Sequence, residues 1–195
     1  MDITAHKKIL REKLIKQRNS IDRNDIVRAS DKIYSKLISL DIINEAKTVM
    51  VYVSFASEVM THEFIKYLIN KKTTVLTPVC VSGGHMIAAK TQCFPEGFEE
   101  NKYGILEIPL KKAVSVEADE IDVVIVPAVS YATDGRRLGY GGGYYDRFIE
   151  KLNDKAITIG ILMDEMICEQ IPIDSHDKKA DIILTQTLSI FKGRY

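Results

Sequence analysis

The residues best suited to chemistry lie between Asp134 and Arg147, a segment that reads Asp-Gly-Arg-Arg-Leu-Gly-Tyr-Gly-Gly-Gly-Tyr-Tyr-Asp-Arg. Five of the chain's 11 glycines fall within residues 135–143. Glycine has no Cβ, so it allows positive φ angles and a close approach of backbone N–H groups to a ligand. The two arginines before the glycines can bind phosphate, and the carboxylate of Asp146 can bind magnesium. The segment therefore predicts a phosphate site and suggests a Mg²⁺-nucleotide.

The elements on either side must position this segment. Residues 123–129 are apolar throughout, which is typical of a strand buried on both faces. Downstream, Tyr145, Phe148, Ile149 and Leu152 recur at helical spacing. The unit therefore reads strand, glycine-rich loop and helix. Unpaired N–H groups and the helix dipole both favour an anion at such a loop.

Two common nucleotide-binding motifs do not fit the segment. A Walker A loop requires Gly-Lys followed by Ser or Thr, and the chain contains no such tripeptide. The dinucleotide fingerprint Gly-x-Gly-x-x-Gly, started at Gly139, ends on Tyr144. Started at Gly141, it ends on Asp146. A flexible turn that binds no ligand stays open as the alternative.

Two further carboxylates lie beside predicted strands. Residues 48–55 are rich in β-branched and aromatic residues, and Glu58 follows them, near the end of a strand where open α/β sheets bind ligands. Simple solvation is the alternative for this glutamate. Asp181 begins the predicted strand 181–185, and we expect that strand to direct it to the same edge of the sheet as Asp146.

The N-terminal segment is basic. Residues 4–18 have the spacing of a helix and carry six Lys or Arg side chains against the single acid Glu12. Three interpretations are open: a solvated surface helix, a nucleic-acid-binding segment, or a helix whose Lys7 and Arg11 share a face and reach a phosphate. The nucleic-acid interpretation is weaker because no aromatic residues alternate with the charges.

The remaining patterns predict a mostly parallel sheet with helices on both faces. Amphipathic helices are predicted at residues 22–40 and from Thr61, and further strands at 73–81, 86–91 and 156–163. Gly83-Gly84 indicates a hairpin, which would make one edge of the sheet antiparallel. We expect a single α/β domain over residues 1–195, with residues 1–40 as a helical pair packed on it.

Composition excludes several classes of protein. Basic and acidic residues both number 27, so the overall charge gives no reason to expect a nucleic-acid partner, although residues 1–40 hold ten basic residues and five acidic ones. Three widely spaced cysteines fit reduced thiols better than a disulfide framework or a zinc site. No apolar run approaches 18 residues and no signal peptide is apparent. We therefore expect a soluble, cytoplasmic monomer without a membrane partner.

The residues from Arg137 to Asp146 carry a resemblance. Their sequence, Arg-Leu-Gly-Tyr-Gly-Gly-Gly-Tyr-Tyr-Asp, resembles the signature of the 5-formyltetrahydrofolate cyclo-ligase family, also called methenyltetrahydrofolate synthetases, and the likeness extends from Lys7 to about Thr185. It implies a Rossmann-like three-layer α/β/α fold. It also implies ATP-dependent conversion of 5-formyltetrahydrofolate to 5,10-methenyltetrahydrofolate through a phosphorylated formyl group, with magnesium bound and ADP and phosphate released.

Carried over position by position, the resemblance implies a set of ligand contacts. ATP would contact Lys7, Lys8, Arg11, Arg137, Leu138, Gly139, Tyr140, Gly141, Gly142, Gly143, Tyr144 and Tyr145. The folate would contact Val53, Glu58, Tyr140, Gly141, Gly142, Gly143 and Tyr144. Catalysis is expected from Arg137, Tyr144 and Glu58, and magnesium binding from Asp146 and Asp181.

One departure from the family stands in the loop itself. Some relatives have Arg-Gly-Lys-Gly where this chain has Tyr140-Gly-Gly-Gly143, so two cations are missing. Their role would pass to Arg136 and Arg137 or to the N-terminal lysines. Two alternative functions stay open: a phosphosugar-type phosphate-binding enzyme of similar fold, and an RNA-binding module that uses residues 1–40.

Overall fold

A central sheet organises the protein. The computed structural model describes residues 2–172, 174 and 177–192. Eight strands form the sheet in the order β13-β12-β10-β7-β1-β2-β3-β6. The five strands from β12 to β2 are parallel, and β13, β3 and β6 are antiparallel to their neighbours. The strands are β1 (Thr48–Val51), β2 (Thr74–Val81), β3 (His85–Lys90), β6 (Ser115–Val116), β7 (Val123–Val126), β10 (Ile157–Ile161), β12 (Ile182–Leu184) and β13 (Ser189–Phe191).

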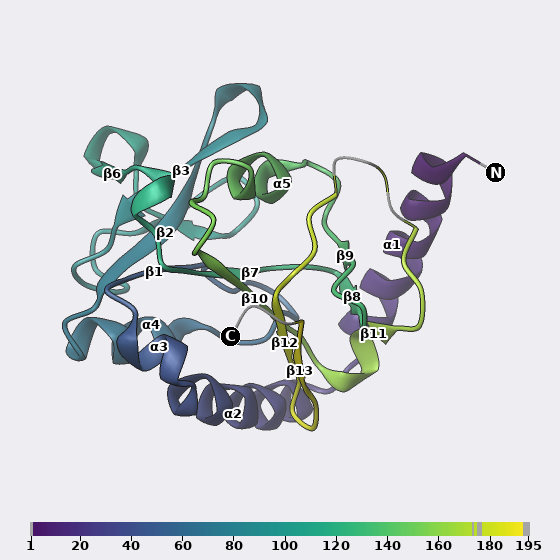
Figure 1. Ribbon diagram of the computed structural model, residues 1–195. Helices are drawn as coiled ribbons and strands as arrows, with labels where there is room; N and C mark the ends of the chain where they lie inside the picture. The colour runs from purple at the N-terminus through teal and green to yellow at the C-terminus, as the bar shows by residue number, and fades with distance from the viewer. Residues whose placement is uncertain (1, 173, 175–176, 193–195) are drawn as a thin grey trace.

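Helices cover both faces of this sheet (Figure 1). The helices α2, α3 and α4 lie on one face and α5 lies on the other, while α1 stands at one end of the sheet. Their bounds are α1 (Ile3–Asn19), α2 (Arg23–Ser39), α3 (Asp41–Glu45), α4 (His62–Asn70) and α5 (Tyr144–Ile149). The Asp22 carboxylate caps α2 by accepting a hydrogen bond from the N–H of Asn24 at 2.8 Å.

Short elements fill the connections. A three-stranded sheet joins β8 (Ser130–Ala132), β9 (Arg137–Leu138) and β11 (Ile167–Cys168) beside α1, and a two-stranded sheet joins β4 (Glu99–Glu100) and β5 (Leu106–Glu107). The 3₁₀ turns are η1 (Ser82–Gly84), η2 (Leu110–Lys112), η3 (Ala118–Glu120) and η4 (Asp164–Met166).

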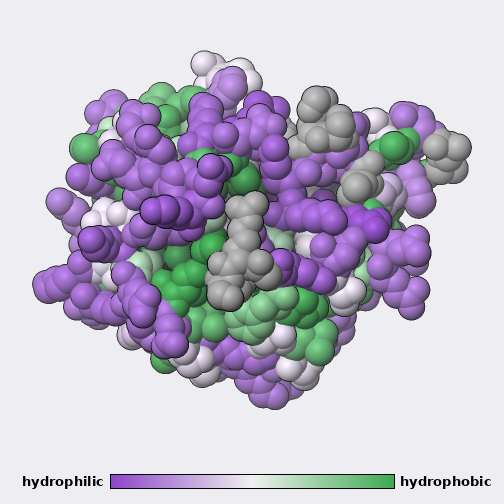
Figure 2. Space-filling view, viewed as in Figure 1, coloured by the Kyte–Doolittle hydropathy of each residue, from purple (hydrophilic) through white to green (hydrophobic). Residues whose placement is uncertain are grey.

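The core lies in two layers, one on each face of the sheet. Val49 and Val51 of β1 pack into the layer under α2 and α4, while Met50 between them packs into the layer that contains Phe148 of α5. This alternation explains why β1 and β7 are apolar at every position: a parallel strand between two helical layers buries both of its faces. The surface outside these layers is largely polar, with apolar side chains gathered near β13 and α2 (Figure 2).

The structure confirms the expected α/β fold with a mostly parallel sheet, and it differs in detail. The hairpin of β2 and β3 forms as predicted, but β6 extends the sheet beyond it and β13 forms the opposite edge. The helix after the glycine loop ends at Ile149, earlier than the apolar spacing indicated. Within the described ranges, no helix is long and apolar enough to cross a membrane. That the whole chain forms one domain stays a prediction.

Candidate active site

A cleft of about 1080 Å³ opens at the carboxyl ends of β1 and β7. Tyr52 and Val53, which follow β1, and Pro127, which follows β7, form part of its wall. Its volume is at the upper end of the range for small-molecule sites. With the exception of Asp181, every residue predicted to contact a ligand lines it: Lys7, Lys8, Arg11, Val53, Glu58, Arg137, Leu138, Gly139, Tyr140, Gly141, Gly142, Gly143, Tyr144, Tyr145 and Asp146.

The glycine loop supplies unused backbone donors at one end of the cleft. Gly141 and Gly143 have φ angles of +97° and +67°, a region that favours glycine. Gly143 precedes α5 without a side-chain cap. Within the described part of the chain, the N–H groups of residues 141–146 donate to no backbone or side-chain acceptor. A row of unpaired N–H groups on the wall of a cleft is suited to phosphate oxygens.

Cations surround this loop. The Nε of Arg11 donates to the carbonyl oxygen of Gly139 at 2.8 Å, and the Arg11 guanidinium lies 3.3 Å from the place that a Cβ at Gly141 would occupy. Lys7 forms an ion pair with Asp177. The side chain of Arg11 is therefore already directed at the loop, and α1 brings its N-terminal cations to the cleft.

Arg147 fixes the other side of the loop. Its Nε donates to the carbonyl oxygen of Gly84 at 3.0 Å, and its Nη2 donates to the carbonyl oxygen of Gly142 at 2.6 Å. A Cβ at Gly84 would lie 2.5 Å from this guanidinium. The turn between β2 and β3 is thereby held against the loop, a contact that local sequence patterns did not indicate.

A buried ion pair lies beneath the loop. Arg137 is 5% exposed and forms an ion pair with Asp146, whose side chain is 25% exposed. The Nη1 of Arg137 also donates to the carbonyl oxygen of Pro127 at 3.3 Å. The Nε of Arg137 and the hydroxyl of Tyr145 are buried and have no hydrogen-bond partner among the described residues. Two such atoms on one segment of a cleft are unusual in a folded protein, and they indicate a site that a ligand completes.

The wall of the cleft also holds a buried carboxylate. Glu58 is 6% exposed, and its Oε2 accepts a hydrogen bond from the N–H of Phe55 at 3.1 Å. Its Oε1 accepts a hydrogen bond from the hydroxyl of Tyr140. Burial raises the pKa of Glu58, although these two hydrogen bonds and the charge of Arg18 oppose the rise. Thr61 and Ser54 exchange two hydrogen bonds of 3.0 Å, which fixes the loop that carries this carboxylate.

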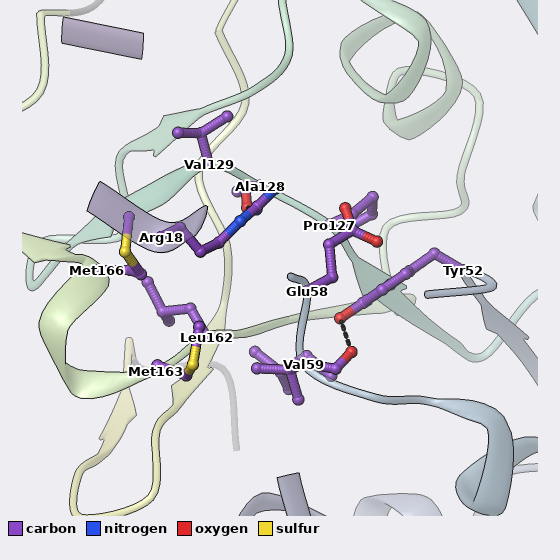
Figure 3. Close-up of a pocket in the computed structure, with 11 residues that line it drawn as sticks. Arg18, Tyr52, Glu58, Val59, Pro127, Ala128, Val129, Leu162, Met163 and Met166 are labelled. Atoms are coloured by element: carbon purple, nitrogen blue, oxygen red, sulfur yellow. Dashed lines mark hydrogen bonds between the residues drawn. The ribbon is translucent and has the colours of Figure 1, made fainter. Parts of the chain in front are cut away.

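Arg18 is the main residue that sequence reasoning missed. It comes from α1, is 5% exposed, and points with Glu58 and Tyr52 into a cavity of about 10 Å³ behind the cleft (Figure 3). The hydroxyl of Tyr52 donates to the carbonyl oxygen of Val59 at 2.9 Å. One signal could have found Arg18: it lies four residues after Leu14, on the apolar stripe of its helix.

Asp181 does not join the cleft, so the expectation that it shares an edge with Asp146 is wrong. It directly precedes β12, which runs parallel to β10, and it therefore lies at the amino ends of the parallel strands. Its Oδ2 accepts hydrogen bonds from the N–H of Thr158 at 2.9 Å and from the Thr158 hydroxyl at 2.7 Å. The beginning of a parallel strand faces away from the edge at which its neighbours end.

Arg136 also lies outside the lining of the cleft. It pairs with Asp134, and its Nη1 donates to the carbonyl oxygen of Ile171 at 3.2 Å. Of the two arginines expected to replace the missing loop cations, Arg137 alone faces the cleft. Other lining residues were not predicted, among them Cys80, Arg147, Asp174 and Asp177.

The residues present fit magnesium that arrives with a nucleotide. Among the described residues, no group of three or more His, Cys, Asp or Glu side chains is placed to hold a metal ion. Magnesium bound to phosphate oxygens needs only one or two protein carboxylates, because water and phosphate supply its other ligands. Asp146 lies on the lining of the cleft and meets that requirement.

Comparisons with known proteins agree with this arrangement. The model of the 5-formyltetrahydrofolate cyclo-ligase family matches residues 3–186. A 5-formyltetrahydrofolate cyclo-ligase from Saccharomyces cerevisiae is 26% identical, with 92% of this chain and 95% of the relative covered. A probable 5-formyltetrahydrofolate cyclo-ligase from Schizosaccharomyces pombe is 31% identical, with 80% of this chain and 83% of the relative covered.

Solved structures show the same likeness. The NMR structure of a 5,10-methenyltetrahydrofolate synthetase from Aquifex aeolicus is 26% identical, with a TM-score of 0.84 and with 97% of this chain and 95% of that chain covered. The synthetase from Mycoplasma pneumoniae, 23% identical with a TM-score of 0.76, shares the fold. The match of a family model to nearly the whole chain shows that this protein belongs to the 5-formyltetrahydrofolate cyclo-ligase family.

Proposed function

We propose that the protein converts 5-formyltetrahydrofolate and ATP to 5,10-methenyltetrahydrofolate, ADP and phosphate. The observation that carries the proposal is one cleft with two differently built ends, the glycine loop with its cations and the buried Glu58 with Tyr140. Membership of the family names the reaction, since its relatives are cyclo-ligases.

ATP would bind at the glycine-loop end. The unpaired N–H groups of residues 141–146 would donate to phosphate oxygens, and Lys7, Lys8 and Arg11 would neutralise their charge. Arg137, held by Asp146 beneath the loop, would stabilise charge on the transferring phosphoryl group. Asp146 would hold magnesium, which would neutralise further phosphate charge.

The folate would bind at the other end, against Glu58 and Val53. An ionised carboxylate fixed by two hydrogen bonds is suited to the N–H donors of a reduced pterin. Tyr144 lines the cleft, where its ring would offer a flat surface to a bound ring. This placement would bring the formyl group next to the terminal phosphate.

The reaction then depends more on the positioning of the two bound substrates than on general acid–base catalysis. The formyl oxygen attacks the terminal phosphorus of ATP and ADP leaves, which gives an iminium phosphate at N5. The amine N10 attacks the iminium carbon, the C–O bond breaks with release of phosphate, and the proton of N10 passes to solvent. Each step moves a group between atoms that the two ends of the cleft would hold in contact.

The alternatives lack such support. Lys7 and Arg11 line the cleft, so the two cations that an RNA-binding module would present to solvent are directed elsewhere. No feature of the site favours a phosphosugar substrate over a nucleotide. Action in the cytoplasm as a monomer stays a prediction.

Mixing the protein with 5-formyltetrahydrofolate and Mg²⁺-ATP tests the proposal. We expect a rise in the near-ultraviolet absorbance of the methenyl product that depends on ATP, with one ADP formed for each product. No rise from folded protein would contradict the proposal. In a second measurement, ¹⁸O placed in the formyl group should appear in the released phosphate, and its release into water would exclude the phosphorylated intermediate.

A further inference from the structure

Arg18 is a buried charge that donates to the carbonyl oxygen of Ala128 at 3.5 Å and to two side chains beside Glu58. Its Nη1 donates to the hydroxyl of Tyr140 at 2.7 Å, and its Nε donates to the hydroxyl of Ser57 at 3.1 Å. Its guanidinium also lies 5.5 Å from the centre of the Tyr140 ring. Ser57 and Glu58 are neighbours in the loop after β1, so Arg18 holds both the loop and the tyrosine.

The hydrogen bonds have a defined direction. The Tyr140 hydroxyl accepts from Arg18, so its single proton is free to be donated, and it donates that proton to the Oε1 of Glu58. Arg18 is thus linked to the Glu58 carboxylate through one hydroxyl. A buried guanidinium is costly without an anion nearby, and Glu58 supplies that anion. Figure 3 shows the Arg18 and Glu58 side chains entering the same small cavity from different elements.

We propose that Arg18 is a positioning residue for the folate: it holds the Tyr140 hydroxyl against Glu58 and thereby keeps that carboxylate correctly oriented. This inference rests on the proposed function, because it assigns a role in binding 5-formyltetrahydrofolate. Arg18 itself is separated from the cleft by Tyr140 and Glu58, and it is absent from the lining of the cleft.

Because charged groups surround Glu58, the pH dependence of kcat/KM for the folate can test the proposal. Arg18 and Tyr140 are the titratable groups that act on its pKa, and the Glu58 charge in turn raises the pKa values of Tyr52 and Tyr145. Arg18 and the Tyr140 hydrogen bond lower the pKa of Glu58 against the effect of burial. Loss of either should raise that pKa, so the acid limb of kcat/KM for the folate should move to higher pH.

The test compares Arg18→Gln with the control Arg28→Gln, which removes an exposed arginine paired only with Asp25. We expect Arg18→Gln to raise KM for 5-formyltetrahydrofolate roughly tenfold or more, the size associated with a hydrogen bond to a charged group, and to change KM for ATP much less. The acid limb should move to higher pH, and Arg18→Lys should restore part of both effects. The control should behave as wild type.

Two results would overturn the inference. One is an unchanged KM for the folate with an unmoved acid limb. The other is an equal loss toward both substrates with an unmoved limb, which would assign Arg18 to folding alone. If Arg18→Gln fails to fold, Tyr140→Phe removes the same link from the half-exposed loop, and it must show the same two effects for the inference to stand. An inactive wild-type protein would instead overturn the proposed function.

Discussion

The two ends of the cleft differ in the groups that form them: backbone N–H groups at one, and hydrogen-bonded side chains at the other. The glycine-loop end uses backbone N–H groups that have no acceptor among the described residues, a run of glycines, and cations that pair with Asp146 or Asp177. The proposed folate end uses side chains that already satisfy one another, with Glu58 held by Tyr140 and by the N–H of Phe55. On the proposed assignment, a ligand would complete the first end, whereas the hydrogen bonds of the second are formed without one.

This difference predicts different responses to mutation. At the glycine-loop end, unpaired donors already cost stability, so substitutions there should affect nucleotide use more than folding. At the folate end, each side chain supports another, so a substitution should affect both binding and stability.

Asp146→Asn should have the largest effect. The asparagine keeps the shape of the side chain but removes the charge that pairs with Arg137 and that would bind magnesium. We expect turnover to fall by roughly 100-fold or more, which is the scale of losing one electrostatic group in an active site. Initial rates of methenyl formation at saturating substrates measure it, with Asp25→Asn as a surface control. Near-normal turnover by a folded variant would remove Asp146 from the mechanism.

Gly141→Ala should specifically weaken the binding of ATP. A Cβ there would be strained by the φ angle of +97° and would crowd the Arg11 guanidinium at 3.3 Å. We expect KM for ATP to rise roughly tenfold because the added Cβ would displace Arg11 from the loop, while the strained angle itself costs about 1–3 kcal/mol of stability. Gly97→Ala is the matched control, because Gly97 has a φ of +86° with no atom within 4 Å of the added Cβ. Both variants should lose similar stability, and an equal rise of KM for ATP in both would contradict this account.

Glu58→Gln should weaken the binding of the folate and remove the acid limb from the pH profile of kcat/KM. Loss of the charge should raise KM for 5-formyltetrahydrofolate by roughly tenfold. Because burial raises the pKa of Glu58 above its ordinary 4.5, the wild-type kcat/KM should fall as the pH drops through that raised pKa, and the variant should lack this limb. A group with a raised folded pKa contributes stability at low pH and loses it as the pH rises, so the variant should gain stability relative to wild type on raising the pH. An identical acid limb in both proteins would exclude Glu58 as its source.

Substitution of two buried tyrosines should have the smallest effects, and these effects should differ between the two positions. Tyr52→Phe leaves the Val59 carbonyl oxygen without its donor, so the free energy of unfolding should fall by about 1–3 kcal/mol. Tyr145→Phe removes a buried hydroxyl that has no partner among the described residues, so that free energy should change by less than about 0.5 kcal/mol or rise. Urea unfolding of both variants measures the difference, and equal losses would show that the Tyr145 hydroxyl is satisfied in solution.

The sequence revealed the glycine-loop end because its residues are contiguous. Residues 134–147 combine glycines, arginines and a carboxylate in one stretch, and the strand before them is marked by unbroken apolar character. The mostly parallel sheet was predicted from the order of predicted strands and helices along the chain. The strands β6 and β13 were missed because two- and three-residue strands carry no period, and their pairing partners define them.

The folate end could be predicted only in part. Glu58 was found by resemblance and by its place after a strand, but Arg18 and Tyr140 are 122 positions apart in the chain and no local pattern joins them. The error at Asp181 has a simpler cause. A strand has a direction, and a residue at its beginning lies at the edge opposite to the cleft.

The most direct test of the two-ended cleft is to determine KM for ATP and for 5-formyltetrahydrofolate in Gly141→Ala and Glu58→Gln under identical conditions. We expect a crossed pattern, in which the first variant raises mainly the KM for ATP and the second mainly the KM for the folate. If both variants raise both constants by the same factor, the cleft does not have separate ends, and the assignment of the glycine loop to ATP and of Glu58 to the folate is wrong.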